Sequence, residues 1–332
     1  MWKRATFGLL ALGLFAAAAM VFWQGAGAVL ATVTSVGWAF LPVCAWYVPA
    51  VLGMGWSWAL IFPPGAGPPW RRLAFVNYLG TTVNALLPVA AVGGEVLKAF
   101  MLAQREVPGA LAGASVVADK AAQVASQLAF GLLGVGALIY LEAQCDLIAW
   151  LLGATLFFSA LLGAFFWVQG QGTFFRMARR GERWLEGRSV GGRAWWRIVG
   201  GAAALDHAFD RIYRHHGRVA LACGLRVVVR LLFVVETWYL ARAMGHPIGW
   251  IEALMLESLT QSVRGMAFVM PSGLGAQEGA FLLLAHSAGL PAEAALALSL
   301  VKRAREIVCG APALVILQWG AGRHLAGWWR RA

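Results

Sequence analysis

One stretch, Pro271-Ser-Gly-Leu-Gly-Ala-Gln-Glu278-Gly279, breaks an apolar region with proline and glycine and places a carboxylate directly after the break. A second stretch, 183 positions earlier, has the same layout, with Pro88 seven residues before Glu95. The same offset relates three further polar positions: Asp119 to Lys302, Lys120 to Arg303 and Gln123 to Glu306. Repeated broken helices with buried charge are typical of transporters. We therefore interpret the two stretches as copies of one repeated unit.

The composition is that of a membrane protein. Hydrophobic residues make up 60% of the 332 and charged residues 13%, with a mean hydropathy of +0.69. A soluble domain contains about 25% charged residues, so the chain is expected to cross the bilayer several times. The net charge of +12 does not indicate nucleic-acid binding, because the basic residues lie mostly in short segments between apolar runs. In such positions they orient spans and contact anionic lipid headgroups.

The apolar runs predict an all-α polytopic protein with about six full spans and two broken or re-entrant helical hairpins. The full spans are expected at residues 5–23, 31–61, 109–141, 146–168, 217–243 and 292–320. The span at 31–61 contains Pro42 and Pro49 and is expected to be kinked or tilted. The broken regions are 73–106 and 249–289, and each has two interpretations: two full crossings or one re-entrant hairpin. The first span is too long for the apolar part of a signal peptide, so we expect it to be retained.

Basic residues indicate the orientation in a bacterial inner membrane. Lys3, Arg71, the segment 169–218 and Arg330 all fall on the cytoplasmic side in one arrangement of these spans, which also makes both termini cytoplasmic. Three crossings separate the first spans of the two repeats, so the repeats have opposite orientation. Such an inverted-topology repeat often underlies alternating access.

We expect a single membrane domain over residues 1–332. Its parts are an extra N-terminal span at 1–28, repeat 1 at 29–141, a connecting span and basic cytoplasmic segment at 142–216, repeat 2 at 217–320 and a basic cytoplasmic tail at 321–332. In the basic segment, Phe209 and Ile212 are among aromatic and aliphatic residues that alternate with arginines at roughly helical spacing. Two interpretations are open: an interfacial helix with its aromatic side chains in the headgroups, or a solvated loop.

Glu95 and Glu278 are the first candidate functional residues. A helix that begins at the adjoining glycines exposes free backbone N–H groups and its positive end toward the membrane interior, which suits a phosphate or carboxylate headgroup. The neighbouring glutamate then takes a proton, pairs with a cationic headgroup or holds Lys98. The structural alternative is that proline and glycine allow tight packing and the glutamate caps the helix.

Other ionisable side chains within spans are expected to line a cavity or to pair, because burying each costs roughly a few kcal/mol. The predicted translocation cavity comprises Asn84, Gly93, Gly94, Glu95, Asp119, Lys120, Arg264, Gly273, Gly275, Gln277, Glu278, Lys302 and Arg303. Supporting charges are expected at Arg226, Arg230, Glu236, Glu257 and Glu306.

Two pairings within this set have competing interpretations. Asp119 and Lys302 either pair across the pseudo-symmetry axis or are each compensated locally, for example Lys302 by Glu306 four residues on. Arg226 and Arg230 share a helix face and form either a cation-lined groove or a structural network with Glu236 or Glu257.

The sequence contains none of the common catalytic motifs. It has no phosphate-binding G-x-x-x-x-G-K-[ST] loop, no G-x-S-x-G and no H-E-x-x-H, and its four cysteines are single and far apart. We therefore expect neither an enzyme nor a cofactor or metal site.

Several motifs resemble a known family. Asn84-Ala-Leu-Leu-Pro88 with Gly93-Gly94-Glu95 resembles the first half of the lysylphosphatidylglycerol synthase transmembrane-region, or flippase-like, family. Residues 257–264, 271–279 and 298–303 resemble its second half, and the similarity is closest to the branch associated with hopanoid biosynthesis. In this family the membrane region is thought to move lipids between leaflets. The chain ends soon after its last span, so the resemblance does not imply lysyl transfer.

We therefore expect a lipid transporter or flippase for a hopanoid or phospholipid-like amphiphile, with anionic membrane lipids and lipid-biosynthesis or export proteins as partners. Two alternatives remain. A secondary transporter of a water-soluble solute has a cavity closed to lipid. A scaffold that recruits lipid-synthesis enzymes depends on the arginines of 169–218 and not on the buried charges.

Overall fold

The computed structural model describes residues 34–87, 93–104, 107–141, 192–266 and 275–329, together with Gly153 and Phe157. All regular structure in these ranges is helical, which confirms the all-α prediction for the described part of the chain. The predicted spans at 5–23 and 146–168 lie outside the described residues, apart from Gly153 and Phe157.

The first group of helices comes before the basic segment. A short 3₁₀ turn, η1 (Gly37–Ala39), leads into α3 (Phe40–Ile61), which is followed by α4 (Trp70–Leu86), α5 (Gly93–Ala103) and α6 (Gly109–Leu141). Pro42 lies in the first turn of α3, where a proline removes no helical hydrogen bond, and α3 continues as one helix past Pro49.

The second group has the same order. After α9 (Gly192–Tyr213) come α10 (His216–Ala243), α11 (Trp250–Met266), α12 (Ala276–Ala285) and α13 (Ala292–Trp329). The first residues of α6 and α13 are 183 positions apart, the same offset that relates Glu95 to Glu278.

The proline–glycine stretches 88–92 and 267–274, where the sequence predicts the breaks, lie outside the described residues. On their two sides, α4 ends at Leu86 and α5 begins at Gly93, and α11 ends at Met266 and α12 begins at Ala276. The following helices are short, with 11 residues in α5 and 10 in α12. At 1.5 Å per residue each is about 15 Å long, roughly half of a hydrocarbon core.

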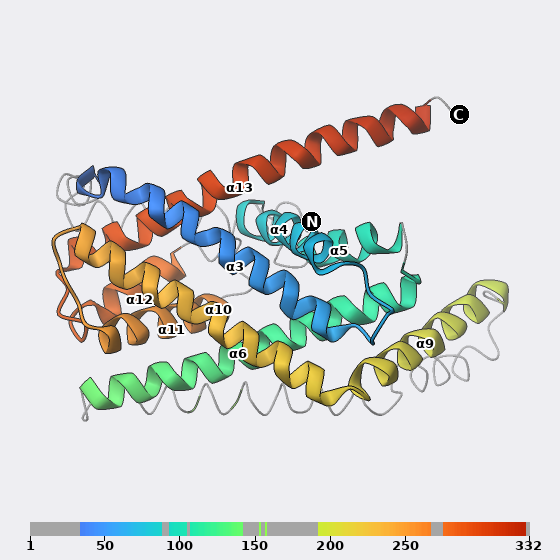
Figure 1. The fold of residues 1–332 in the computed structure, drawn as a ribbon, viewed down its shortest axis with the longest axis horizontal. Helices are drawn as coiled ribbons and strands as arrows, with labels where there is room; N and C mark the ends of the chain where they lie inside the picture. Colours follow the sequence, from blue (N-terminus) through green and yellow to red (C-terminus); the bar gives the residue numbers. More distant parts are fainter. Residues whose placement is uncertain are drawn as a thin grey trace.

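The two groups pack against each other through α3 and α10, which run antiparallel (Figure 1). The indole N–H of Trp46 donates to the Leu232 carbonyl at 2.9 Å, and the Ser57 hydroxyl donates to the Ala222 carbonyl at 3.0 Å. Several further contacts come in matched pairs: α6 packs against α11 as α13 packs against α4, and α5 against α6 as α12 against α13.

Two separate apolar cores form. The first core contains Trp58 of α3, apolar residues of α6 between Leu111 and Ala122, and Ala222 of α10. The second core contains Val43 of α3, apolar residues of α6 between Phe130 and Leu138, and Val234, Leu240 and Ala241 of α10. Along α6 and α10, polar and charged side chains occupy the stretch between the two cores, including Gln123, Ser126, Arg226 and Arg230. The polar region therefore lies near the middle of these helices.

The outside of the bundle is apolar. On α3, the exposed large side chains include Leu41, Val48, Leu52 and Trp56. Among the described residues, 37–61 and 109–141 are helical stretches long and apolar enough to cross a membrane. An apolar exterior around a charged interior is the reverse of a soluble protein and suits contact with lipid.

The structure corrects the interfacial-helix prediction for the second half of α9. Ala208, Phe209 and Ile212 are buried in the first core, where α9 packs against α6, so these side chains do not lie in the headgroups. The ring of Tyr213 stacks on that of Phe209, with centroids 6.1 Å apart. Residues 205–213 of the basic segment are thus docked on the bundle and do not form a solvated loop either.

Candidate functional site

The first cluster of buried charges joins the start of α5 to α6. Lys98 lies 3.2 Å from Glu95 and 3.8 Å from Asp119, measured from its Nζ to the nearest carboxylate oxygen. The Nζ of Lys120 lies 3.5 Å from the other Glu95 oxygen. Lys98 and Asp119 are almost fully buried, whereas the Lys120 side chain is 41% exposed. The cluster therefore connects the interior to the surface.

Helix α10 links this cluster to the second group of helices. Arg226 forms an ion pair and hydrogen bond with Asp119 of α6. One turn further on, Arg230 donates to the side chains of Gln261 on α11 at 2.6 Å and Ser126 on α6 at 3.3 Å. The two arginines form a network with groups from α6 and α11, which is the structural-network alternative, although its partners are not the predicted Glu236 or Glu257.

The second cluster contains a buried lysine–glutamate pair. Lys302 of α13 pairs with Glu257 of α11 and also donates to the Thr237 hydroxyl at 2.6 Å. Thr237 and Gln261 each donate to Glu257 at 2.6 Å. All hydrogen-bonding groups around this carboxylate are thus provided by α10, α11 and α13.

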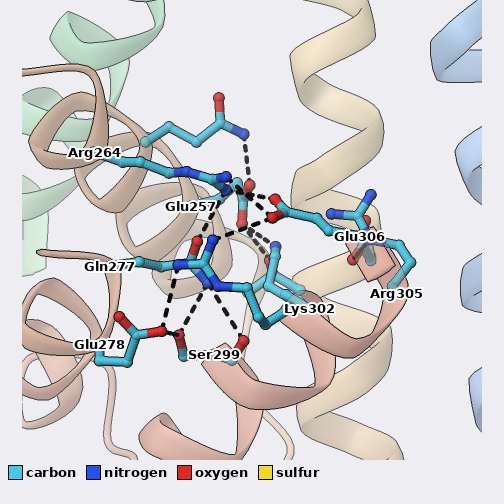
Figure 2. Close-up of polar contacts among 12 residues, drawn as sticks. Glu257, Arg264, Gln277, Glu278, Ser299, Lys302, Arg305 and Glu306 are labelled. Carbon is cyan, nitrogen blue, oxygen red and sulfur yellow. Dashed lines mark hydrogen bonds and ion pairs between the residues drawn. The ribbon is translucent and has the colours of Figure 1, made fainter. Parts of the chain in front are cut away.

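A second part of the same cluster lies at the start of α12. Figure 2 shows Arg264 and Glu306 pointing toward one another, with Gln277 beside them. Arg264 binds both oxygens of Glu306, at 2.5 and 3.1 Å, and donates to Gln277 at 3.0 Å. The amide of Gln277 donates to the Ser299 hydroxyl at 2.9 Å. Arg303 lies 3.5 Å from Glu278 and 3.3 Å from Glu306.

One ion pair recurs at related positions in the two groups of helices. Glu95 pairs with Lys120 and Glu278 with Arg303, each across 3.5 Å and 25 positions of sequence. In both cases the glutamate is in the first turn of the short helix after the break, and the cation lies on the long helix that follows.

At the start of each short helix, one backbone N–H group is bound by a side chain of this chain. Glu278 accepts a hydrogen bond from the Gly275 N–H at 2.8 Å, and Asn84 accepts one from the Gly94 N–H at 2.8 Å. The expectation of free N–H groups for a headgroup at these two positions is therefore wrong, and the capping alternative holds for Glu278. Gly275 has φ +80°, which glycine adopts without strain.

Asp119 and Lys302 have other partners than either interpretation predicts. Asp119 binds Arg226 and Lys98, and Lys302 binds Glu257 and Thr237. The pairing of Asp119 with Lys302 is therefore wrong, as is that of Lys302 with Glu306, because Glu306 is bound by Arg264 and Arg303.

The structure groups most predicted site residues into these two clusters. Gly93 and Gly94 form the start of α5, where a Cβ on Gly94 would lie 2.0 Å from the Gly80 carbonyl oxygen. Gly273 lies outside the described residues. Sequence reasoning missed Ser299 and Thr237, and it did not include Arg305 among the predicted site residues. Arg305 is buried, lies 3.2 Å from Glu236 and has the rings of Tyr47 and Phe233 at 5.1 and 5.3 Å. The sequence did contain a signal for Arg305: it lies three residues after Lys302, which places both side chains on one face of the same helix.

Within the described ranges, no three His, Cys, Asp or Glu side chains are arranged to hold a metal ion. The site consists instead of buried carboxylates, arginines, lysines and amides on helices with an apolar exterior. This defines an all-helical membrane protein with a charged interior.

Comparison with known families agrees with this class. The family model of the lysylphosphatidylglycerol synthase TM region matches residues 9–312, and the chain belongs to this family. Membership indicates a membrane protein involved in lipid handling. No curated protein and no solved structure matched the chain.

Proposed function

We propose that this protein is a lipid transporter that moves an amphiphile, such as a hopanoid or phospholipid, between the leaflets of the bacterial inner membrane. The headgroup passes through the charged region between the two apolar cores while the acyl or ring portion stays in lipid. Family membership supports the lipid as cargo, and the buried charges support a polar route within the bilayer.

An inverted repeat is part of this proposal. Its support is the shared helix order, the 183-position offset and the antiparallel contact of α3 with α10. The short helices α5 and α12 are too short to cross a bilayer alone, which favours re-entrant hairpins over two full crossings. One hairpin opens toward the cytoplasm and the other toward the outside, with both termini in the cytoplasm.

The observation behind the proposal is the recurring pair of Glu95 with Lys120 and Glu278 with Arg303. A structural role alone does not require the same ion pair twice, since burying charge costs more than apolar packing. In the proposed mechanism the headgroup replaces one partner of a pair at a time, so that no buried charge is left without compensation. Proton binding by a carboxylate or the lipid gradient supplies the energy, and no chemical reaction is involved.

A leaflet-exchange assay tests the proposal. The full-length protein is reconstituted into liposomes with fluorescent phosphatidylglycerol, and quenching of the outer leaflet measures exchange. We expect wild-type protein to accelerate exchange, and Glu95→Gln and Glu278→Gln each to slow it by about tenfold or more. The control Asp210→Asn removes an exposed carboxylate on α9 and is expected to behave as wild type.

Wild-type activity in both glutamate variants would exclude their role. Absence of exchange with wild-type protein, despite correct insertion, would contradict lipid transport itself and leave the solute-transporter and scaffold alternatives.

A further inference from the structure

Two arginines from different helices converge on one carboxylate in the second cluster. Arg264 of α11 binds Glu306 through two guanidinium nitrogens, and Arg303 of α13 lies 3.3 Å from the same side chain. A bidentate arginine with a second arginine beside it also matches the geometry of a phosphate group. The position of the Glu306 carboxylate is thus one that a phosphate oxyanion can occupy.

The charged network has more positive than negative charge. Its cations are Lys98, Lys120, Arg226, Arg230, Arg264, Lys302, Arg303 and Arg305, and its carboxylates are Glu95, Asp119, Glu236, Glu257, Glu278 and Glu306. The excess is two positive charges, or one without Lys120, whose side chain is 41% exposed. The segments 88–92 and 267–274, which join the broken helices, contain no charged residue. An excess of buried positive charge favours binding of an anion.

The group around Glu306 is the more accessible part of the second cluster. The Arg264 side chain is 28% exposed, whereas Lys302 and Arg305 are exposed by 7% and 5%. Glu306 itself is partly exposed. An incoming anion can therefore reach Arg264 without first breaking the Lys302–Glu257 pair.

We propose that Arg264 and Arg303 form a binding subsite for a phosphate group, and that Glu306 is an internal anion which the phosphate displaces. The proposal rests on the proposed function, because the phosphate belongs to the headgroup of the transported lipid. The related position in the first repeat is Gln123, a neutral side chain, so the internal competitor is a feature of the second repeat alone. Glu306 returns to the arginines when the lipid leaves, so that Arg264 regains its carboxylate partner.

Binding to the purified full-length protein in detergent tests this subsite. The probes are dioctanoyl phosphatidylglycerol, inorganic phosphate and the uncharged dioctanoylglycerol. We expect Glu306→Gln to bind phosphatidylglycerol about tenfold more tightly than wild type, because the competing carboxylate is gone. The double variant R264Q/E306Q is expected to lose this gain, and the control Asp210→Asn to match wild type.

Binding of both phosphatidylglycerol and inorganic phosphate supports a subsite for phosphate itself, and binding of phosphatidylglycerol alone supports one that needs the lipid tails. Equal binding of phosphatidylglycerol and dioctanoylglycerol by wild-type protein overturns the subsite, even if the variants do not fold. Unchanged affinity in folded Glu306→Gln, or full retention of the gain in R264Q/E306Q, also overturns it.

The leaflet-exchange assay separates this result from the proposed function. Tight phosphate binding without leaflet exchange leaves the subsite intact and rejects transport. Exchange that depends on Glu95 and Glu278, without any effect of Glu306 on binding, rejects the subsite alone.

Discussion

At the scale of single residues, the interior contains ion pairs, and some of their members have further hydrogen-bonding partners. Glu257 accepts from Lys302, Thr237 and Gln261, so neither its charge nor its lone pairs are left uncompensated. Desolvation of two ions costs several kcal/mol each, and the attraction between them repays this only in such a complete arrangement. Replacing one residue of such an ion pair is therefore expected to lower the stability of the protein far more than replacing both.

Lys302→Met should destabilise the protein by about 3–5 kcal/mol, because Glu257 then remains buried without a cation. The double variant E257Q/K302M should recover most of this loss. Thermal unfolding in detergent measures both, and Arg214→Gln, which breaks an exposed pair with Asp210, is the control with little change. Equal losses in the single and double variants would show that the pair is not what stabilises this position.

At the scale of elements, small residues allow helices to approach closely. A Cβ on Gly134 of α6 would lie 1.9 Å from the Ser258 hydroxyl oxygen and 2.9 Å from its Cβ on α11, whereas a Cβ on Gly136 would have no neighbour within 4 Å. Such contacts bring α6 and α11 together at the point where the polar region meets the second core.

Gly134→Ala should therefore destabilise the protein by about 1–3 kcal/mol, since α6 and α11 must separate to admit the methyl group. Gly136→Ala, on the same helix, should have no such effect. The comparison of the two variants by thermal unfolding isolates packing from helix propensity. Equal behaviour of the two would contradict the close contact between α6 and α11.

The helix boundaries follow from local chemistry, and for this reason the sequence predicts them well. The long apolar runs predict both ends of α6 and α10 within one residue. They also predict the end of α3 and the start of α13, but α3 begins at Phe40, nine residues after the predicted start, and α13 continues to Trp329. The partners of buried charges were not predictable in the same way. Asp119 binds Arg226, 107 positions away, because α6 and α10 contact each other there. The pattern of apolar residues within one helix predicts which face is buried, but it does not predict which other helix packs on that face. The docking of α9 on α6 could not be predicted for the same reason. An amphipathic helix has one apolar face, and the sequence does not show whether that face contacts lipid or protein.

At the scale of the whole molecule, the described helices form two apolar cores. Arg226 and Arg230 lie between the cores along α10, and the Lys302–Glu257 pair lies beside residues of the second core. Helices α3, α6 and α10 contribute side chains to both cores, so the cores are connected by continuous helices. In the proposed transport mechanism, we expect one core to open at a time while the other remains closed. The two groups of helices make matched contacts, so each group can adopt the arrangement of the other when the open core changes.

The most direct test of this account is the accessibility of the charged region from each side of the membrane. Ser299 is fully buried beside Gln277 and Glu278, and Ser299→Cys in a background with Cys44, Cys145, Cys223 and Cys309 replaced by serine places one thiol there. If the region opens alternately, a membrane-impermeant maleimide should label this cysteine slowly from the outside in cells and from the cytoplasmic side in inverted vesicles. Protection from both sides, in protein that is inserted and folded, would contradict the central claim that this region is the route of the headgroup.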